Sequence, residues 1–145
     1  MEVETLTELL NIPMVKVTEI IKEVENKLYL RVEASEEREA ICSSCGKAHE
    51  KVHSIEEVMV EDLRVSGKRV FLVLKKRKVR CPEDDQIHVE KVDWVMERFT
   101  KRFAEEIGRL TAITTNQEAG WYLGLDDEKV YRIDKKILEE GAKKN

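Results

Sequence analysis

The hydrophobic residues of this chain change their spacing once, close to Trp94, and this change constrains the fold more than any other feature. Upstream of it, apolar and polar residues alternate, as in segment 28–32, which is typical of strands with one buried face. Downstream, apolar residues between Phe99 and Leu110 recur every three or four positions, which predicts an amphipathic helix. We therefore expect an α+β protein with a β-rich domain over 1–95 and a helical domain over 96–145.

Turn signals in the first part predict an antiparallel β module. Glu25-Asn26 separates two strands of a hairpin, and Ser66-Gly67 precedes a long strand that begins near Val70 and runs to Cys81-Pro82. A short amphipathic run over Glu4–Leu10 precedes the first strand.

The second part contains signals for two further helices. Segment 116–123 predicts a short helix closed by Gly124, because glycine readily adopts the left-handed conformation that ends helices. Asp126 is a suitable N-cap for a last helix that carries Val130 and Ile133 and ends near Gly141.

The three cysteines of the chain favour a metal site over a disulfide scaffold. Cys42 and Cys45 form a C-x-x-C pair followed by Gly46, which is one half of a structural zinc site. Cys81-Pro82 follows across a predicted hairpin, so the two loops can meet in space. The alternative is that the cysteines stay reduced and pack as small apolar side chains.

The fourth ligand is open at this stage. His88 is the best chemical candidate because imidazole commonly binds zinc, whereas Asp84 has the C-x-x-D spacing and offers a carboxylate. His49 and His53 are weaker candidates. We predict a structural zinc bound by Cys42, Cys45, Cys81 and His88, with Asp84 as the alternative to His88.

The segment from Gln117 to Ile133 has the spacing of a helix-turn-helix. Gly120 allows two helices to cross closely, and Gly124 turns the chain between them. Any tight helical hairpin with a glycine turn shares this pattern, which is the alternative interpretation. The presumed recognition helix also starts with the acidic run 126–128, which repels phosphate.

The charge of the chain bears on nucleic-acid binding. The net charge of −4 opposes strong binding irrespective of sequence, for which a basic domain is usual. Basic residues are nevertheless concentrated in the segment 68–80, either as a phosphate-binding face or as a solvated strand edge protected by lysines. The candidate DNA-binding residues are Lys75, Lys76, Arg77, Lys78, Arg80, Lys129, Arg132, Lys135 and Lys136.

Taken together, an ordered series of short motifs resembles transposases of the ISL group of insertion sequences over nearly the whole chain. The motifs are Leu6-Thr7-Glu8-Leu9-Leu10, Val15 to Thr18, Cys42-x-x-Cys45-Gly46 with Val52-His53-Ser54, Asp62-Leu63, Val70 to Leu74, Lys76 to Pro82, Val92-x-Trp94, Arg98-Phe99-Thr100 and Leu123-Gly124-Leu125. In this family a zinc-binding and helix-turn-helix region recognises the transposon ends, and a DDE-type nuclease domain follows. The sequence departs from the family where a further Cys or His is expected after Cys81, and in the acidity of 126–128.

The resemblance implies a zinc-ribbon-like domain and a three-helix helix-turn-helix unit that bind duplex DNA at transposon ends. The chain stops at Asn145, before any nuclease domain, and offers no nucleophile-base set, so we expect no enzymatic activity. The alternative function is a protein-interaction module with decayed DNA binding, which pairs with itself or with a full-length transposase. With no apolar span and no signal-like start, we expect a cytoplasmic prokaryotic protein, nucleoid-associated if it is bound to DNA, without a membrane or small-molecule partner.

Overall fold

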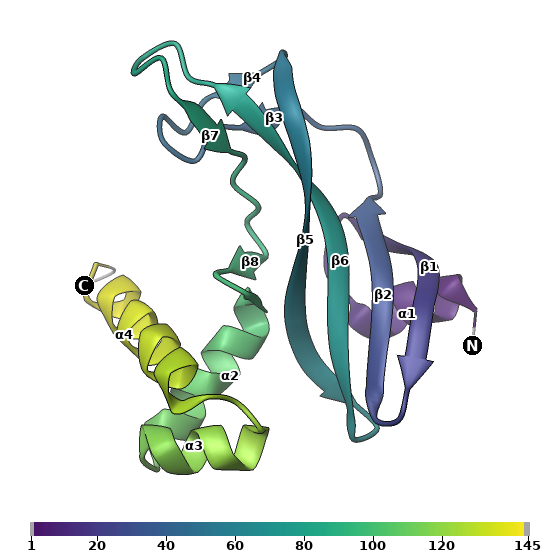
Figure 1. Ribbon diagram of the computed structural model, residues 1–145, viewed down its shortest axis with the longest axis vertical. Helices are drawn as coiled ribbons and strands as arrows, with labels where there is room; N and C mark the ends of the chain where they lie inside the picture. Colours follow the sequence, from purple (N-terminus) through teal and green to yellow (C-terminus); the bar gives the residue numbers. More distant parts are fainter. Residues whose placement is uncertain (1, 144–145) are drawn as a thin grey trace. The chain divides into compact units, whose positions relative to one another are not determined.

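A computed structural model of the chain describes residues 2–143 (Figure 1). The chain consists of two compact units, Met1–Trp94 and Val95–Asn145. The division falls one residue before the boundary expected from the sequence. The fold is α+β, as predicted, because the first unit is mostly strand and the second mostly helix.

In the first unit a helix is followed by seven strands. They are α1 (Val3–Leu10), β1 (Val15–Val24), β2 (Lys27–Ala34), β3 (Ala40–Ile41), β4 (Ala48–His49), β5 (Val52–Val65), β6 (Lys68–Arg80) and β7 (Ile87–Val89). The main sheet has the order β1-β2-β6-β5, with β7 paired to β6, whereas β3 and β4 form a separate small sheet. Both predicted turns are present: Glu25 and Ser66 have positive φ angles of 52° and 51°.

The prediction of a wholly antiparallel module is wrong at one place, because β2 and β6 pair in parallel. Their register runs from Lys27 opposite Arg69 to Arg31 opposite Val73. The other pairings of the main sheet that involve β1, β5 and β7 are antiparallel. Alternation of apolar residues specifies which face is buried but not the direction of the partner strand, so the sequence pattern did not reveal this crossover.

The core of the first unit lies between the sheet and α1. Leu30 and Leu72 in the central strands are fully buried, and Leu6 and Leu10 of α1 are 5% and 4% exposed. The hydroxyl of Thr7 accepts a hydrogen bond of 2.8 Å from the backbone N–H of Val17, which fixes α1 to the first strand. The amphipathic run thus forms a helix because one face is covered by the hairpin.

Beyond this core, β5 and β6 continue as a long hairpin, with Val52 still opposite Val79. β3, β4 and β7 lie around the same end of β6 (Figure 1). A second small core is formed there by Ala40, Cys42, Val79 and Cys81. This end of the first unit places the cysteines.

The second unit consists of β8 (Val95–Met96), β9 (Phe99–Thr100), α2 (Lys101–Thr111), α3 (Asn116–Leu123) and α4 (Asp127–Lys143). α3 has the predicted bounds, and Gly124 ends it with a φ of 70°. Thr100 and Thr115 cap α2 and α3 by accepting hydrogen bonds from the N–H groups of Phe103 and Glu118. Among residues 2–143, no helix is long and apolar enough to cross a membrane.

The connection between α3 and α4 is tight. The N–H of Leu125 donates to the carbonyl of Gly120 at 2.8 Å, and a Cβ on Gly120 would lie 2.7 Å from the carbonyl oxygen of Leu125. Asp126 caps α4, because its Oδ1 accepts from the N–H of Glu128 at 3.2 Å. Val130 and Ile133 are buried beneath the turn.

Candidate metal centre and candidate nucleic-acid interface

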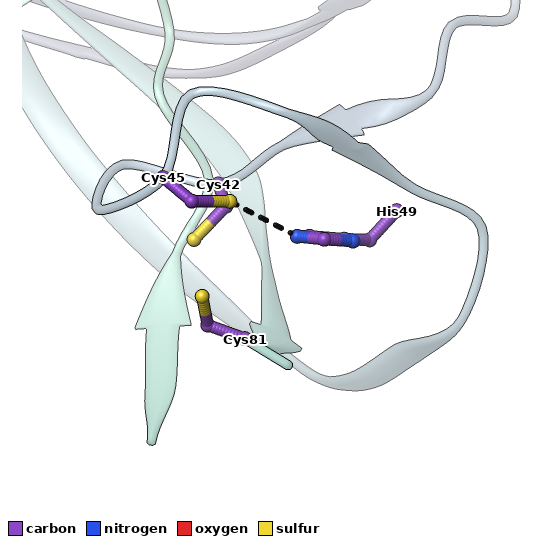
Figure 2. A group of neighbouring side chains, drawn as sticks. All are labelled: Cys42, Cys45, His49 and Cys81. Atoms are coloured by element: carbon purple, nitrogen blue, oxygen red, sulfur yellow. Dashed lines mark hydrogen bonds between the residues drawn. The ribbon is translucent and has the colours of Figure 1, made fainter. Parts of the chain in front are cut away.

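Four side chains converge at the end of β6. Ligand atoms of Cys42, Cys45, His49 and Cys81 all lie within 4.8 Å of one another (Figure 2). The Sγ of Cys45 is 3.3 Å from the Nε2 of His49. Three sulfurs and one imidazole nitrogen in this arrangement form a Cys₃His set, which is a common ligand set of structural zinc.

Short-range structure explains why these positions converge. Cys42 and Cys45 share a loop closed by a hydrogen bond of 2.9 Å from the N–H of Gly46 to the carbonyl of Cys42. The left-handed backbone of Gly46, with a φ of 74°, makes this turn possible. His49 follows on β4, which pairs with β3 just before the loop, and Cys81 follows the last residue of β6.

The environment of the thiols suits metal binding. The pKa of the Cys42 thiol is held below its ordinary value by N–H groups of Cys45 and Ser44, although burial opposes this effect. Burial raises the pKa of the Cys81 thiol, and N–H groups of Glu83 and Asp84 offset part of that effect. A zinc ion bound here neutralises buried thiolate charge, so the residues present fit the ion.

The structure places the predicted fourth ligands elsewhere. His88 on β7 is not in the four-residue group, and its Nε2 lies 2.7 Å from Oδ2 of Asp84. The pKa of the Asp84 carboxyl is lowered by the N–H of Gln86 and by His88. From the sequence, His49 was a weaker candidate than His88 and Asp84. The signal that could have identified His49 is its place on the strand that directly follows the loop of Cys42 and Cys45.

A buried carboxylate ties this metal-binding end to the long hairpin. Glu90, 3% exposed, accepts from the Nε and the backbone N–H of Arg77 at 2.9 and 2.7 Å and pairs with Arg38 at 3.3 Å. Arg77 also donates to the carbonyl of Arg38 at 2.7 Å. Glu90 itself pairs by backbone with Cys42. Arg77 therefore holds the cysteine loop against β6.

The basic segment of β6 is largely matched by acids within the first unit. Arg69 makes two hydrogen bonds of 2.8 Å to Glu61, and Lys78 and Arg80 lie 3.3 Å from Glu56 and Asp85. The two remaining DNA-binding candidates of this strand, Lys75 and Lys76, have no ion pair recorded among residues 2–143. Within the described part of the chain, ion pairs thus neutralise most of the basic segment and leave Lys75 and Lys76 as its cations outside them.

A second group of cations lies in the second unit. Arg98, Lys129 and Arg132 line one shallow hollow together with Glu97, Phe99 and Ile133. Lys129, Arg132 and Lys136 share one side of α4 at positions i, i+3 and i+7. Lys136 contacts Glu97 at 3.0 Å, and Lys135 is not part of the hollow. Arg98, in the β8–β9 turn, was not a sequence-based candidate.

The geometry of the first unit defines a small structural zinc module with a Cys₃His cluster. Residues 38–84, about a third of the chain, match the family described as the zinc-finger of transposase IS204/IS1001/IS1096/IS1165. This segment is therefore a zinc ribbon of the type found in the N-terminal region of these transposases, and both the resemblance and the zinc are confirmed for it. No curated protein and no solved structure gives a match to the chain.

The matched segment also bears on the ligands. It contains Cys42, Cys45, His49 and Cys81 and ends at Asp84, so His88 lies outside it.

Proposed function

We propose that this chain binds duplex DNA as part of the N-terminal region of an IS204/IS1001-type transposase, with transposon ends as its targets. In this proposal the zinc ion, bound by Cys42, Cys45, His49 and Cys81, stabilises the first unit and takes no part in chemistry. DNA is contacted mainly by the second unit.

The observation that carries the proposal is the group of cations beside α4. Arg98, Lys129 and Arg132 line one hollow, and no ion pair is recorded for them among the described residues. Cations without an acidic partner retain their charge for phosphate, whereas Arg69, Arg77, Lys78 and Arg80 of β6 are paired with neighbouring carboxylates. The tight α3–α4 connection supports the proposal, because a helix-turn-helix joins its two helices by a short turn of this kind and places the second helix in the major groove.

The acidic start of α4 is partly explained by its local structure. Asp126 uses its carboxylate as the helix cap, and acidic residues in a first turn are favoured by the helix dipole. Asp127 and Glu128 are the acidic residues of this first turn, and both are exposed. They favour readout of cytosine amino groups over binding of any sequence, which suits a specific binder.

The proposal is tested by fluorescence anisotropy of a labelled duplex over a series of salt concentrations. The double variant K129A/R132A should bind more weakly, and the slope of log K against log salt should fall by about 2 for two lost phosphate contacts. K135A, on the same helix but outside the hollow, is the matched control and should change neither quantity as strongly. An unchanged slope in the double variant, or no binding by the unaltered chain at low salt, overturns the proposal.

A second candidate function, a protein-interaction module, is supported by aromatic exposure on α3. Trp121 and Tyr122 are 86% and 74% exposed, and Ile113 before this helix is 83% exposed. Aromatic residues are enriched at protein interfaces and commonly dominate their binding energy. A stable dimer that dissociates on W121S/Y122S substitution and ignores DNA, measured by sedimentation, supports this function over DNA binding.

A further inference from the structure

The two cysteine loops of the metal centre have the same backbone hydrogen bonds. In the first loop the N–H of Cys42 donates to the carbonyl of Lys47 at 3.0 Å, and Gly46 donates back to Cys42 at 2.9 Å. In the second, the N–H of Cys81 donates to the carbonyl of Gln86 at 2.8 Å, and Asp85 donates back to Cys81 at 2.8 Å. The loops therefore correspond residue by residue.

Backbone conformation strengthens the correspondence. The fifth residue of each loop is left-handed, with a φ of 74° at Gly46 and 56° at Asp85. A non-glycine residue in this region is uncommon, although Asp tolerates it better than most. The shared geometry aligns Cys45 of the first loop with Asp84 of the second.

Asp84 does not act as Cys45 does. Its Oδ1 accepts from the N–H of Gln86 at 2.9 Å, and its Oδ2 contacts Nε2 of His88 at 2.7 Å. Both oxygens have partners within the protein, although the carboxylate also lies near the Cys81 thiol, and Asp84 is outside the four-residue group. The remaining member of the group, His49, comes from β4 instead.

We propose that Asp84 occupies the second ligand position of the Cys81 loop without binding the metal, that His49 supplies the fourth donor in its place, and that D84C converts the site to four thiolates. The proposal rests on the ligand set proposed above. It identifies Asp84 and His49 as the two residues that decide between a Cys₃His and a Cys₄ centre. The exchange adds one negative charge to the site, since a neutral imidazole is replaced by a thiolate.

Cobalt titration of the purified full chain tests this proposal, because thiolate-to-cobalt absorption grows with the number of bound sulfurs. Zinc competition then gives the relative affinity of each variant. H49A should weaken metal binding by more than about tenfold, the lower end of the loss seen when only an outer partner of a ligand is removed. H49A/D84C should bind cobalt again, with the absorption of four thiolates, and D84A should resemble the unaltered chain.

The outcomes distinguish a wrong ligand set from a wrong inference about Asp84. Unchanged binding in H49A contradicts the proposed ligand set itself. Loss of binding in D84A as severe as in H49A shows that the carboxylate is a ligand and overturns the inference. D84C alone keeps every metal donor of the unaltered chain, so it tests whether a cysteine at position 84 binds the metal even if H49A fails to fold. A three-thiolate spectrum in both D84C and H49A/D84C also overturns it.

Discussion

Arg77 donates from Nε to Oε2 of Glu90 at 2.9 Å and from Nη2 to Oε1 at 3.0 Å, so this cation of β6 is paired with a buried carboxylate. This pairing gives Arg77 a structural function within the first unit, and its contact with phosphate stays a prediction. Burial alone raises the pKa of Glu90, but hydrogen bonds from Arg77 outweigh burial and hold that pKa below its ordinary value.

The first prediction concerns this pair. R77A should lower the free energy of unfolding of the zinc-loaded protein by about 3 kcal/mol, because it leaves the carboxylate of Glu90 buried with one weaker partner. K76A, the neighbouring substitution on the same strand, is the control and should change stability by less than about 0.5 kcal/mol. Urea unfolding followed by circular dichroism measures both, and equal stability of the two variants would contradict the structural function of Arg77.

The second prediction concerns removal of the metal. A strong zinc chelator should abolish the amide exchange protection of β3, β4 and the Cys42–Lys47 loop, since without zinc only a small apolar core holds these segments together. Protection of α2 and α4, in the other unit, should persist. Hydrogen exchange read by mass spectrometry distinguishes the segments. Simultaneous loss of protection in both units would show that zinc stabilises more than the ribbon.

The third prediction concerns the turn between α3 and α4. G120A should destabilise the protein by about 1–3 kcal/mol, because its Cβ would lie 2.7 Å from a backbone oxygen that has little freedom to move. G108A is the matched control. Its Cβ would meet only the side chain of Ile137, at 3.1 Å, and alanine favours the helix by up to about 1 kcal/mol. Thermal unfolding should therefore give the lower Tm for G120A, and the reverse order would refute the tight crossing.

Local signals predicted the elements of this chain well. Gly124 ends α3, Ser66-Gly67 turns β5 into β6, and Asp126 caps α4, because each position depends on the conformation or hydrogen bond of a single residue. The same signals gave no information on the parallel pairing of β2 with β6. Strand direction is decided by the path of the chain between the strands, about which alternation of apolar residues says nothing.

The metal centre shows the same limit. The thiolate positions follow from the spacing of the cysteines, whereas the choice between His49 and His88 depends on which strand returns to the loop. Tertiary neighbours also decide which cations are paired with acids. Arg77 bonds to Glu90, whereas Arg132 lines the same hollow as Arg98. The absence of enzymatic activity and the cellular location stay predictions.

The central claim, binding of duplex DNA through α4, is tested most directly by selecting random duplexes on the zinc-loaded protein at physiological salt. The unaltered chain should enrich one sequence motif, and K129A/R132A should lose this enrichment. No enriched motif, together with no binding at low salt, would contradict it.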